Sequence, residues 1–405
     1  MHFFPILSTL RRHKTAATLI ILEIAFTCAI VCNTVFVIRE RLARMDRPSG
    51  VAEAELLDVR LTGIGTKTDP YALTEQDLAA LRAIPGVKGV AVANEVPFGN
   101  SSWNSDVSPR PQDPSGVNAT MYIGSPGLLD VLGTQLAAGR GFLPGEYVDY
   151  EAAEKKVTSI SSVILTRDLA NKLFPGKNAV GRNVYVIGEY PQTVVGVVDR
   201  LARPNDFGHP DHAFYTMIMP IKLPYTQAGH YVVRLDPSRA AEIKAAIETT
   251  LTRIDPARIV LRELSFAEVR ADYFKQDRSM AYLLVGVSLA LLVITALGVV
   301  GLASFWVQQR TRQIGIRRAL GATRGDILRY FQVENFILAT AGIVLGMVLA
   351  YGINLWLMHS YQVPRLPAEF LPIGAALLWL LGQLAVLGPA MRAATIPPAI
   401  ATRTV

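Results

Sequence analysis

Cysteine is almost absent from this sequence. Among its 405 residues there are two, Cys28 and Cys32. They lie four residues apart in one apolar run, where a disulfide along a single helix face has poor geometry, so we expect two small packing residues and no disulfide. The long segment of soluble character that follows contains no cysteine, and it therefore needs a true hydrophobic core in order to fold.

The sequence also lacks the common nucleotide-binding and hydrolytic motifs. Gly176-Lys177 has neither the preceding glycine spacing nor the following Ser or Thr of a phosphate-binding loop, and there is no HExxH, CxxC pair or GxSxG. His209 and His212 flank a Pro-Asp pair, which indicates a loop more strongly than a metal site. We therefore expect no enzymatic activity, no metal site and no directly bound cofactor. If the protein uses ATP and Mg²⁺, another chain supplies the ATPase.

The excess of basic residues is confined to three short segments. The net charge of the chain is +7. Segments 1–14, 308–334 and 388–405 hold eleven basic and two acidic residues, a charge of +9, which leaves −2 for the rest. This distribution argues against a nucleic-acid-binding protein, because the large remainder of the chain is close to neutral.

Four long runs carry little or no charge: 15–38, 279–309, 335–358 and 371–391. At about 1.5 Å per residue, each is long enough to cross a hydrocarbon core of about 30 Å. The first run is too long for a signal peptide and is not followed by a small-residue cleavage site, so we expect it to be retained as a span. The runs predict four transmembrane helices, with a large segment, 39–278, between the first and the second.

The arginines predict how these spans are oriented. The loop 310–334 holds six arginines, and short loops rich in Lys and Arg stay in the cytoplasm. Alternation of the spans then places the N-terminus, 1–14, and the tail, 392–405, in the cytoplasm, and the short loop 359–370 outside. Segment 39–278 is extracytoplasmic in this arrangement, which its length permits whatever its charge.

The arginine-rich loop has a predicted shape of its own. The residues around Ile314 predict a short helix, and Gly321 is well suited to end it in the left-handed conformation. Thr323 and Asp326 predict the N-cap and capping box of a second helix. Apolar residues alternate with the arginines, so the segment can pack on one side and present charge on the other. A loop that only fixes the orientation of the spans is the alternative.

The string RTRQIGIRRALGATRGDIL at 310–328 closely resembles the cytoplasmic coupling loop of MacB-type, FtsX-like ABC transporter permeases. In that family the loop enters a groove on a partner ATPase. The resemblance implies that Arg317 and Arg318 pair with acidic groups of the ATPase, while Ile314, Leu320 and Gly321 set the fit. The full set of coupling residues that it implies is Arg312, Ile314, Gly315, Arg317, Arg318, Ala319, Leu320, Gly321, Ala322 and Thr323.

Segment 39–278 is predicted to be an α+β domain. β-α-β patterns at about 51–96 and 230–265 bracket a mostly β insertion at about 97–229, which is rich in Gly, Pro, Asn and Asp. We expect the two bracketing parts to form one discontinuous, porter-like module. The expected fold class is thus a membrane α-helical protein with four transmembrane helices and an α+β extracytoplasmic domain inserted between helices 1 and 2.

Two pieces of the predicted insertion, 125–146 and 163–200, are similar to the periplasmic core domain of the MacB family. At Thr166-Arg167 the chain departs from the Asn-Glu that the family usually has. The tail GPAMRAATIPPAIATR also resembles the family's ending. The resemblance covers most of the chain, and it implies a permease with no ATPase domain fused to these residues.

Two further features bear on mechanism. Glu23 is an ionisable residue inside the first span; a structural carboxylate that bonds to a neighbouring span or reaches water is favoured over a proton relay. Residues 38–45 continue the first span and residues 266–280 precede the second, both with helical character and no helix breaker. We expect continuous helices there, which would act as stiff levers between the spans and the outer domain.

The expected function is that of a permease subunit in an ABC transporter of the bacterial inner membrane. ATP hydrolysis by a separate ATPase dimer would move the periplasmic domain by mechanotransmission, and export or efflux is the expected process. The expected partners are that ATPase and a second permease copy or a related permease. A periplasmic adaptor and an outer-membrane channel are further candidates. Control of a cell-wall hydrolase and release of lipoproteins are alternatives within the family, and a membrane-anchored sensor is the alternative outside it.

Overall fold

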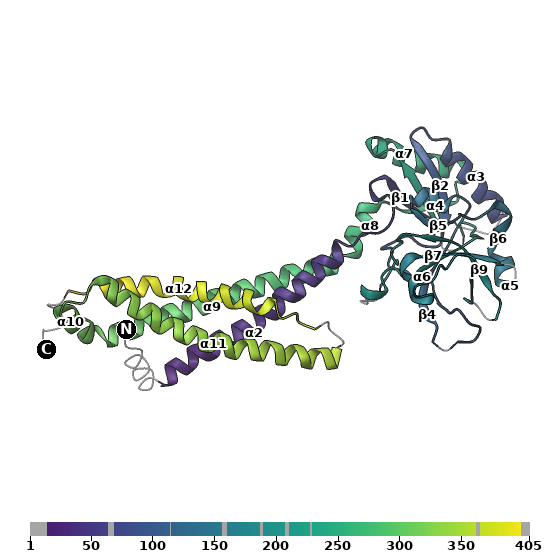
Figure 1. Cartoon of the computed structure of the whole chain (residues 1–405). Coiled ribbons are helices and arrows are strands. Elements are labelled where there is room, and N and C mark those ends of the chain that lie inside the picture. Colours follow the sequence, from purple (N-terminus) through teal and green to yellow (C-terminus); the bar gives the residue numbers. More distant parts are fainter. Residues whose placement is uncertain are drawn as a thin grey trace. The chain divides into compact units, whose positions relative to one another are not determined.

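The computed structural model describes residues 14–63, 69–113, 115–155, 160–186, 189–206, 210–226, 229–361 and 365–397. The chain divides into two compact units (Figure 1): a membrane unit, formed by the residues up to Met45 and those from Gln276 on, and an α+β unit, Asp46–Lys275. Four helices of the membrane unit are long and apolar enough to cross a membrane. The α+β unit lies between the first and the second of them in the sequence, so the predicted fold class is confirmed.

The four long helices of the membrane unit are α2 (Lys14–Met45), α9 (Lys275–Gln309), α11 (Arg324–Tyr361) and α12 (Phe370–Ala394). The shortest has 25 residues, and at about 1.5 Å per residue this exceeds a hydrocarbon core of about 30 Å. The first helix continues to Met45, which confirms the predicted helical extension of the first span.

Small residues form the contact between α2 and its two neighbours α11 and α12. A Cβ added at Gly346 of α11 would lie 2.5 Å from the Cβ of Cys28, and one added at Gly374 of α12 would clash with the Sγ of Cys32. Without those side chains the helix backbones can approach closely. Both cysteines are buried and free. They are packing residues, as predicted.

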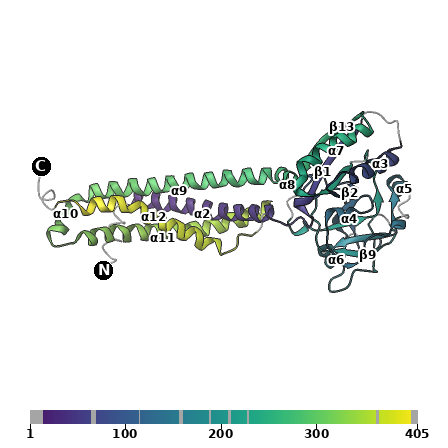
Figure 2. The same ribbon diagram turned by 90° about the horizontal axis from the view of Figure 1, so that it is seen from above.

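Helix α9 is much less enclosed than α2. In its most apolar stretch 11% of the residues are buried, against 56% in α2. Figure 2 shows α9 along one side of the bundle. Its outward side chains are available to lipid or to another protein. The most exposed of its large apolar side chains are Tyr282, Leu283, Leu289, Val293, Ile294 and Leu297.

Two β-α-β segments interlock in the α+β unit. The first consists of β1 (Leu56–Gly63), α3 (Pro70–Arg82) and β2 (Val87–Ala93), and the second of β12 (His230–Leu235), α7 (Ala240–Ile254) and β13 (Arg258–Ser265). They form one sheet in the order β13-β1-β12-β2. Each segment thus has its two strands separated by a strand of the other, and β12 pairs antiparallel with both β1 and β2. Neither segment can complete the sheet alone, although more than 130 residues separate them.

The residues between β2 and β12 form a second sheet of seven strands. Its strands run in the order β3-β4-β10-β7-β9-β5, with β8 paired to β9. A two-stranded pair, β6 and β11, and the short helices α4 (Leu128–Leu132), α5 (Tyr150–Lys155) and α6 (Arg167–Leu173) complete this part. The bounds of the strands are Asn104–Val107 (β3), Val117–Ile123 (β4), Leu136–Gly139 (β5), Val148–Asp149 (β6), Ser162–Thr166 (β7), Asn183–Val184 (β8), Gln192–Val198 (β9), Thr216–Met219 (β10) and Ile221–Lys222 (β11).

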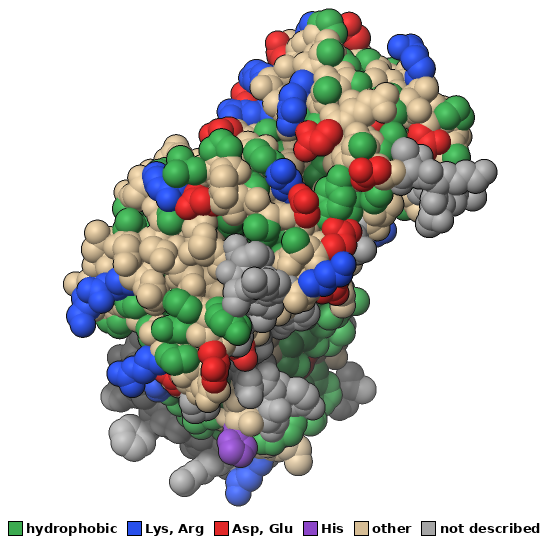
Figure 3. All heavy atoms as spheres, turned by 90° about the vertical axis from the view of Figure 1, so that its right-hand side faces the viewer, with side chains coloured by type: hydrophobic (Ala, Val, Ile, Leu, Met, Phe, Trp, Pro, Cys, Tyr) green, Lys and Arg blue, Asp and Glu red, His purple; other side chains and the backbone are tan. Residues whose placement is uncertain are grey.

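One hydrophobic core joins both sheets of the α+β unit. It includes Val59 and Tyr231 of the four-stranded sheet together with Val163, Val194 and Met217 of the seven-stranded sheet, all of which are fully buried. The absence of cysteine is therefore compensated by ordinary apolar burial. On the face that Figure 3 presents, acidic and basic side chains are interspersed with apolar ones, without a field of one sign.

The predicted continuous helix over 266–280 is wrong. Helix α8 covers Phe266–Tyr273, and α9 begins at Lys275. Phe274, at φ −89° and ψ 10°, interrupts the two. The interruption coincides with aromatic packing, because the ring of Phe274 lies against that of Phe98, with centroids 5.2 Å apart. The sequence contains no Pro or Gly here, so local signals did not reveal the break.

Candidate functional site

The arginine-rich loop folds as the sequence predicts. Helix α10 (Thr311–Ala319) is followed by Gly321 at φ +98°, and α11 begins at Arg324. The backbone N–H of Thr323 donates to the Asp326 carboxylate at 2.9 Å, and the N–H of Asp326 donates to the Thr323 hydroxyl at 3.2 Å. This reciprocal capping box and the left-handed glycine are both confirmed.

One face of α10 is fixed to the membrane unit. Ile314 is 4% exposed and packs in the same apolar cluster as Ile327 and Phe331 of α11. Gly315, beside it, is also buried. Ile314 was expected to help set the fit to a partner, but its side chain is used inside the chain. It seats α10 against the start of α11.

The rest of α10 and its C-cap residue present exposed apolar and basic side chains. Leu320 is 83% exposed and Ile316 is 47% exposed. Arg312, Arg317 and Ala319 are exposed as well. The Arg317 guanidinium lies 4.8 Å from the centre of the Tyr330 ring, which steadies this side chain while leaving it at the surface. Gly321 and Thr323 are exposed, and Ala322 is half-buried.

Arg318 has a partner within the chain. Its Nη1 donates to the carbonyls of Ala394 at 3.1 Å and Ile396 at 2.7 Å. These groups lie at the end of α12, where carbonyls lack partners within the helix and a cation is favourable. Arg318 therefore ties α10 to α12. We expected Arg318 to pair with an acidic group of the ATPase, and the sequence did not reveal this contact within the chain.

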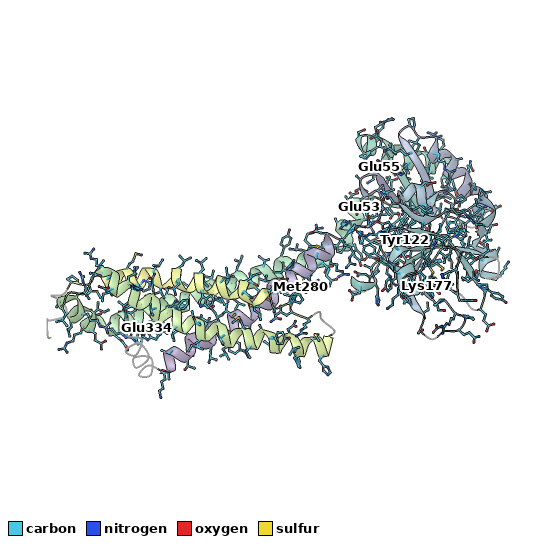
Figure 4. The ribbon with its side chains drawn as sticks, viewed as in Figure 1. Glu53, Glu55, Tyr122, Lys177, Met280 and Glu334 are labelled. Atoms are coloured by element: carbon cyan, nitrogen blue, oxygen red, sulfur yellow. The ribbon has the colours of Figure 1, made fainter. Side chains whose placement is uncertain are left out.

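A buried ion pair joins the ends of the helices that flank α10. Arg310, between α9 and α10, donates from Nη1 to both carboxylate oxygens of Glu334 in α11, at 3.0 and 2.8 Å. The two side chains are 7% and 1% exposed. The guanidinium also lies 5.4 Å from the centre of the Trp306 ring. Figure 4 labels Glu334 within the helix bundle.

Sequence reasoning counted Arg310 and Glu334 as two separate loop charges. A signal was present, because Glu334 directly precedes an apolar run and Arg310 directly follows one. Charges at the facing ends of two spans that are joined by a short loop are natural partners. The pair fixes both ends of the segment that carries α10.

Glu23 lies against a glycine of α9. A Cβ added at Gly298 would be 2.5 Å from either carboxylate oxygen of Glu23. One turn further along α2, the Thr27 and Thr295 hydroxyls form a buried hydrogen bond of 2.8 Å. Among the residues that the structure describes, no donor is within hydrogen-bonding distance of the Glu23 carboxylate. Glu23 is half-buried, and the structure does not bring it near the coupling residues.

The α+β unit has a cleft of about 470 Å³, and its lining includes Arg82, Lys88, Asp130 and Arg234. Lys88 and Arg234 both bind the carboxylate of Glu55, at 2.8 and 2.6 Å. Two of the three cations in the lining thus share a single carboxylate. Within the described ranges no group of three or more metal-ligating side chains occurs, and His209 lies outside them.

Comparison with known families matches both units of the chain. The MacB-like periplasmic core domain model matches residues 18–250, and the FtsX-like permease C-terminal model matches residues 285–398. The first match covers more than half of the chain. The second contains α10, all of α11 and the part of α9 from residue 285 on.

Individual relatives give the same result. An uncharacterized ABC transporter permease of Bacillus subtilis, YknZ, is 24% identical over 82% of this chain and 79% of its own length. Macrolide export ATP-binding/permease proteins MacB of Chromobacterium violaceum and Shewanella oneidensis are 30% and 27% identical, over 47% and 80% of this chain. The chain spans 30% and 48% of the length of those two MacB proteins.

Among solved structures, the extracellular domain of the YknZ transporter matches 51% of this chain and all of its own, with 16% identity and a TM-score of 0.32. This score is too low to carry an argument about the fold, so the assignment depends on the family models. Since the first of these matches more than half of the chain, the protein belongs to the MacB-type, FtsX-like family of ABC transporter permeases.

Proposed function

We propose that this permease transmits the movement of a separate ATPase to its α+β unit, and that α10 is the part that the ATPase contacts. Closure of an ATPase dimer on ATP would push α10, the long helices would shift with it, and the α+β unit would change its state. The substrate would be handled by the α+β unit rather than passed between the spans. No residue of this chain is proposed to be catalytic, and the hydrolysis of ATP is proposed to occur on the partner.

The observation that carries the proposal is the two-sided construction of α10. Its inner face is fixed by Ile314 and by Arg318. The Arg310–Glu334 ion pair connects the residue directly before α10 to α11. Leu320, Ile316 and Arg312 are exposed, and Arg317 is exposed while it lies over the Tyr330 ring of α11. A loop that only fixed the orientation of the spans would need the positive charge, but it would not need a rigid seat or an exposed leucine.

The wider assembly is also a proposal. We place α10 and both termini in the cytoplasm, the α+β unit in the periplasm, and the spans in the inner membrane as part of a homodimer or a heterodimer with a related permease. The names of the MacB relatives refer to macrolide export, which supports export or efflux as the process. An adaptor and an outer-membrane channel are further partners that we propose for this process.

The test is a double substitution at exposed residues of α10 and its C-cap, Arg317→Glu with Leu320→Glu. Both side chains are exposed, so we expect insertion and folding to be retained while ATPase binding and coupled ATP turnover fall by at least about tenfold, or about 1.4 kcal/mol. Lys177→Glu, an exposed charge reversal in the α+β unit, is the control. Unchanged ATPase binding in the double variant would contradict the proposal.

Orientation is tested with the same residue. A cysteine in place of Arg317 should react with a membrane-impermeant maleimide in opened vesicles but not in intact cells. The native Cys28 and Cys32 are buried, so the background should be low. Labelling in intact cells would place α10 outside and end the proposal.

A further inference from the structure

The α+β unit is held together at the place where the chain enters and leaves it. The incoming segment is 47–53 and the outgoing segment is α8 with Phe274. Side chains from both segments, and from two loops of the unit, meet in what we call the base cluster. Its members are Arg47, Glu53, Phe98, Asp206, Arg270, Tyr273 and Phe274.

Arg270 of α8 is the centre of the base cluster. Its Nη1 donates to the Glu53 carboxylate at 2.6 Å, and its Nη2 donates to the carbonyl of Arg47. The guanidinium also lies 5.0 Å from the centre of the Phe98 ring and 5.8 Å from that of Phe274. One side chain therefore contacts the incoming segment, the outgoing segment and a loop. Figure 4 labels Glu53, and Figure 1 shows α8 in the same part of the unit.

Phe98 brings in the connection between the two sheets. It lies in the segment that leaves β2 of the four-stranded sheet and leads to β3 of the seven-stranded sheet. It is 4% exposed although its φ is +62°, a conformation that a bulky residue rarely adopts. Such a conformation persists only where the surroundings impose it. Its ring packs on those of Tyr273 and Phe274, with centroids 5.4 and 5.2 Å away.

Asp206 brings in a second loop of the seven-stranded sheet, the one between β9 and β10. Its carboxylate accepts from Arg47 at 2.9 Å and from the Tyr273 hydroxyl at 3.1 Å. In the same loop, the backbone N–H of Ala202 donates to the carbonyl of Ser49 at 2.8 Å. Gly50, at φ +83°, allows this approach, because a Cβ there would collide with the carbonyl of Arg200.

We propose that Arg270 is a positioning residue for mechanical transmission: it fastens the incoming and outgoing segments to each other and, through Phe98, to the link between the two sheets, so that a displacement of α8 reaches both sheets together. This inference rests on the proposed function. The helix is interrupted at Phe274, so no single continuous helix carries the movement from α9 into α8. Side-chain contacts around Arg270 make the connection instead.

The test measures hydrogen exchange in the full permease bound to its ATPase, with no nucleotide and with ATP plus orthovanadate. In the native protein we expect nucleotide to change the exchange of amides in α10 and in loops 94–100 and 199–206, by at least about twofold. In Arg270→Gln we expect α10 to respond as before while both loops lose their response. A role confined to stability would lower protection everywhere without removing the response of the two loops alone.

Arg262→Gln is the matched control. Arg262 forms an ion pair with Asp272 of α8, and among the described residues it has no side-chain hydrogen bond, ion pair or ring contact with the incoming segment or Phe98. We expect it to respond like the native protein. Should Arg270→Gln fail to fold, Arg270→Lys serves instead, because lysine keeps the bond to Glu53 and loses the flat stacking on the two rings. We expect it to weaken the response of loop 94–100.

The outcomes separate the two proposals. If α10 does not respond to nucleotide in the native protein, the proposed function fails and this inference fails with it. If α10 responds to nucleotide, and both loops respond in Arg270→Gln or Arg270→Lys as strongly as they do in the native protein, the fastening role is overturned. The proposed function then still stands. The fastening role is also overturned if, in the native protein, α10 responds to nucleotide and neither loop does.

Discussion

Near each end of α9 an arginine pairs with a glutamate and lies over aromatic rings, but the two pairs differ in how deeply they are buried. Near one end, Arg270 binds Glu53 and lies over Phe98 and Phe274; at the other, Arg310 binds Glu334 and lies over Trp306. The Arg310 and Glu334 side chains are 7% and 1% exposed, whereas those of Arg270 and Glu53 are 20% and 33% exposed. The more buried pair, Arg310–Glu334, is expected to stay intact, because separating it would leave an unpaired charge in the interior at a large cost in stability. The shallower pair can be rearranged with less loss of stability.

The largest expected effect is at the deeper end. Glu334→Gln leaves the Arg310 cation buried without its counter-charge, which typically costs about 3–5 kcal/mol. We expect poor accumulation of the protein and a marked loss of thermal stability in detergent. The control is Arg39→Gln, which breaks the Arg39–Glu369 pair, whose side chains are both 64% exposed, and should cost less than about 1 kcal/mol. Equal losses in the two variants would remove the distinction between deep and shallow pairs.

The second effect is a pH dependence near the shallower end. Glu95 lies three residues before Phe98, and burial raises its pKa to about 8. The hydrogen bond that its carboxylate accepts from the backbone N–H of Trp103 and the positive charge of Arg203 both oppose this rise in pKa. The neutral form is thus favoured in the folded state. Stability from this group is fully present below its ordinary pKa of 4.5 and is lost as the pH rises through about 8.

Thermal unfolding of the full protein, followed by tryptophan fluorescence, checks this sign. Trp103 is the only tryptophan between Asp46 and Lys275. We expect the melting temperature of the α+β unit to fall between pH 6 and pH 9, at a cost on the order of 2 kcal/mol. Glu95→Gln keeps an acceptor for Trp103 and should abolish most of this slope. A slope that is the same in both proteins would assign the titration to another group.

A smaller effect is expected when the shallower pair is broken. Glu53→Gln keeps a neutral acceptor for Arg270, so the free energy of unfolding should fall by about 1 kcal/mol. Chemical denaturation of the purified permease measures this change. A loss as large as that in Glu334→Gln would mean that the two ends of α9 are equally rigid.

The smallest effect on stability is expected at the exposed C-cap residue of α10. Leu320→Ser alters a side chain that is 83% exposed, so the melting temperature should change by less than the equivalent of about 0.5 kcal/mol. ATPase binding, measured in parallel, should nevertheless weaken. A clear loss of stability would show that Leu320 packs within the chain and is not available to a partner.

The features that the sequence predicted correctly depend on neighbouring residues. Gly321, Thr323 and Asp326 lie within six positions of one another, so their capping chemistry can be identified without knowledge of the fold. The four spans are recognisable from length and hydropathy alone. The strands β1, β2, β12 and β13 lie within the two predicted β-α-β patterns, 51–96 and 230–265, because each strand has a clear pattern and a turn beside it.

The features that were missed depend on residues far apart in the sequence. The break at Phe274 accompanies packing on Phe98, which is 176 positions away, and the break has no local breaker residue. Arg318 bonds to the end of α12, more than 70 positions away. Arginine looks the same in a sequence whether it faces a partner protein or caps a helix of its own chain, so composition could not separate these roles.

The small-residue contact of Cys28 with Gly346 has a consequence for biosynthesis. Cys28 is translated more than 300 residues before Gly346, and the whole α+β unit lies between them in the sequence. At about 5–20 residues per second, α2 therefore stays in the bilayer for roughly 15–60 s before its glycine partner has been made. During that interval the nascent first span is exposed to lipid, chaperones and proteases, and its narrow face of alanine and cysteine is what any of them would encounter.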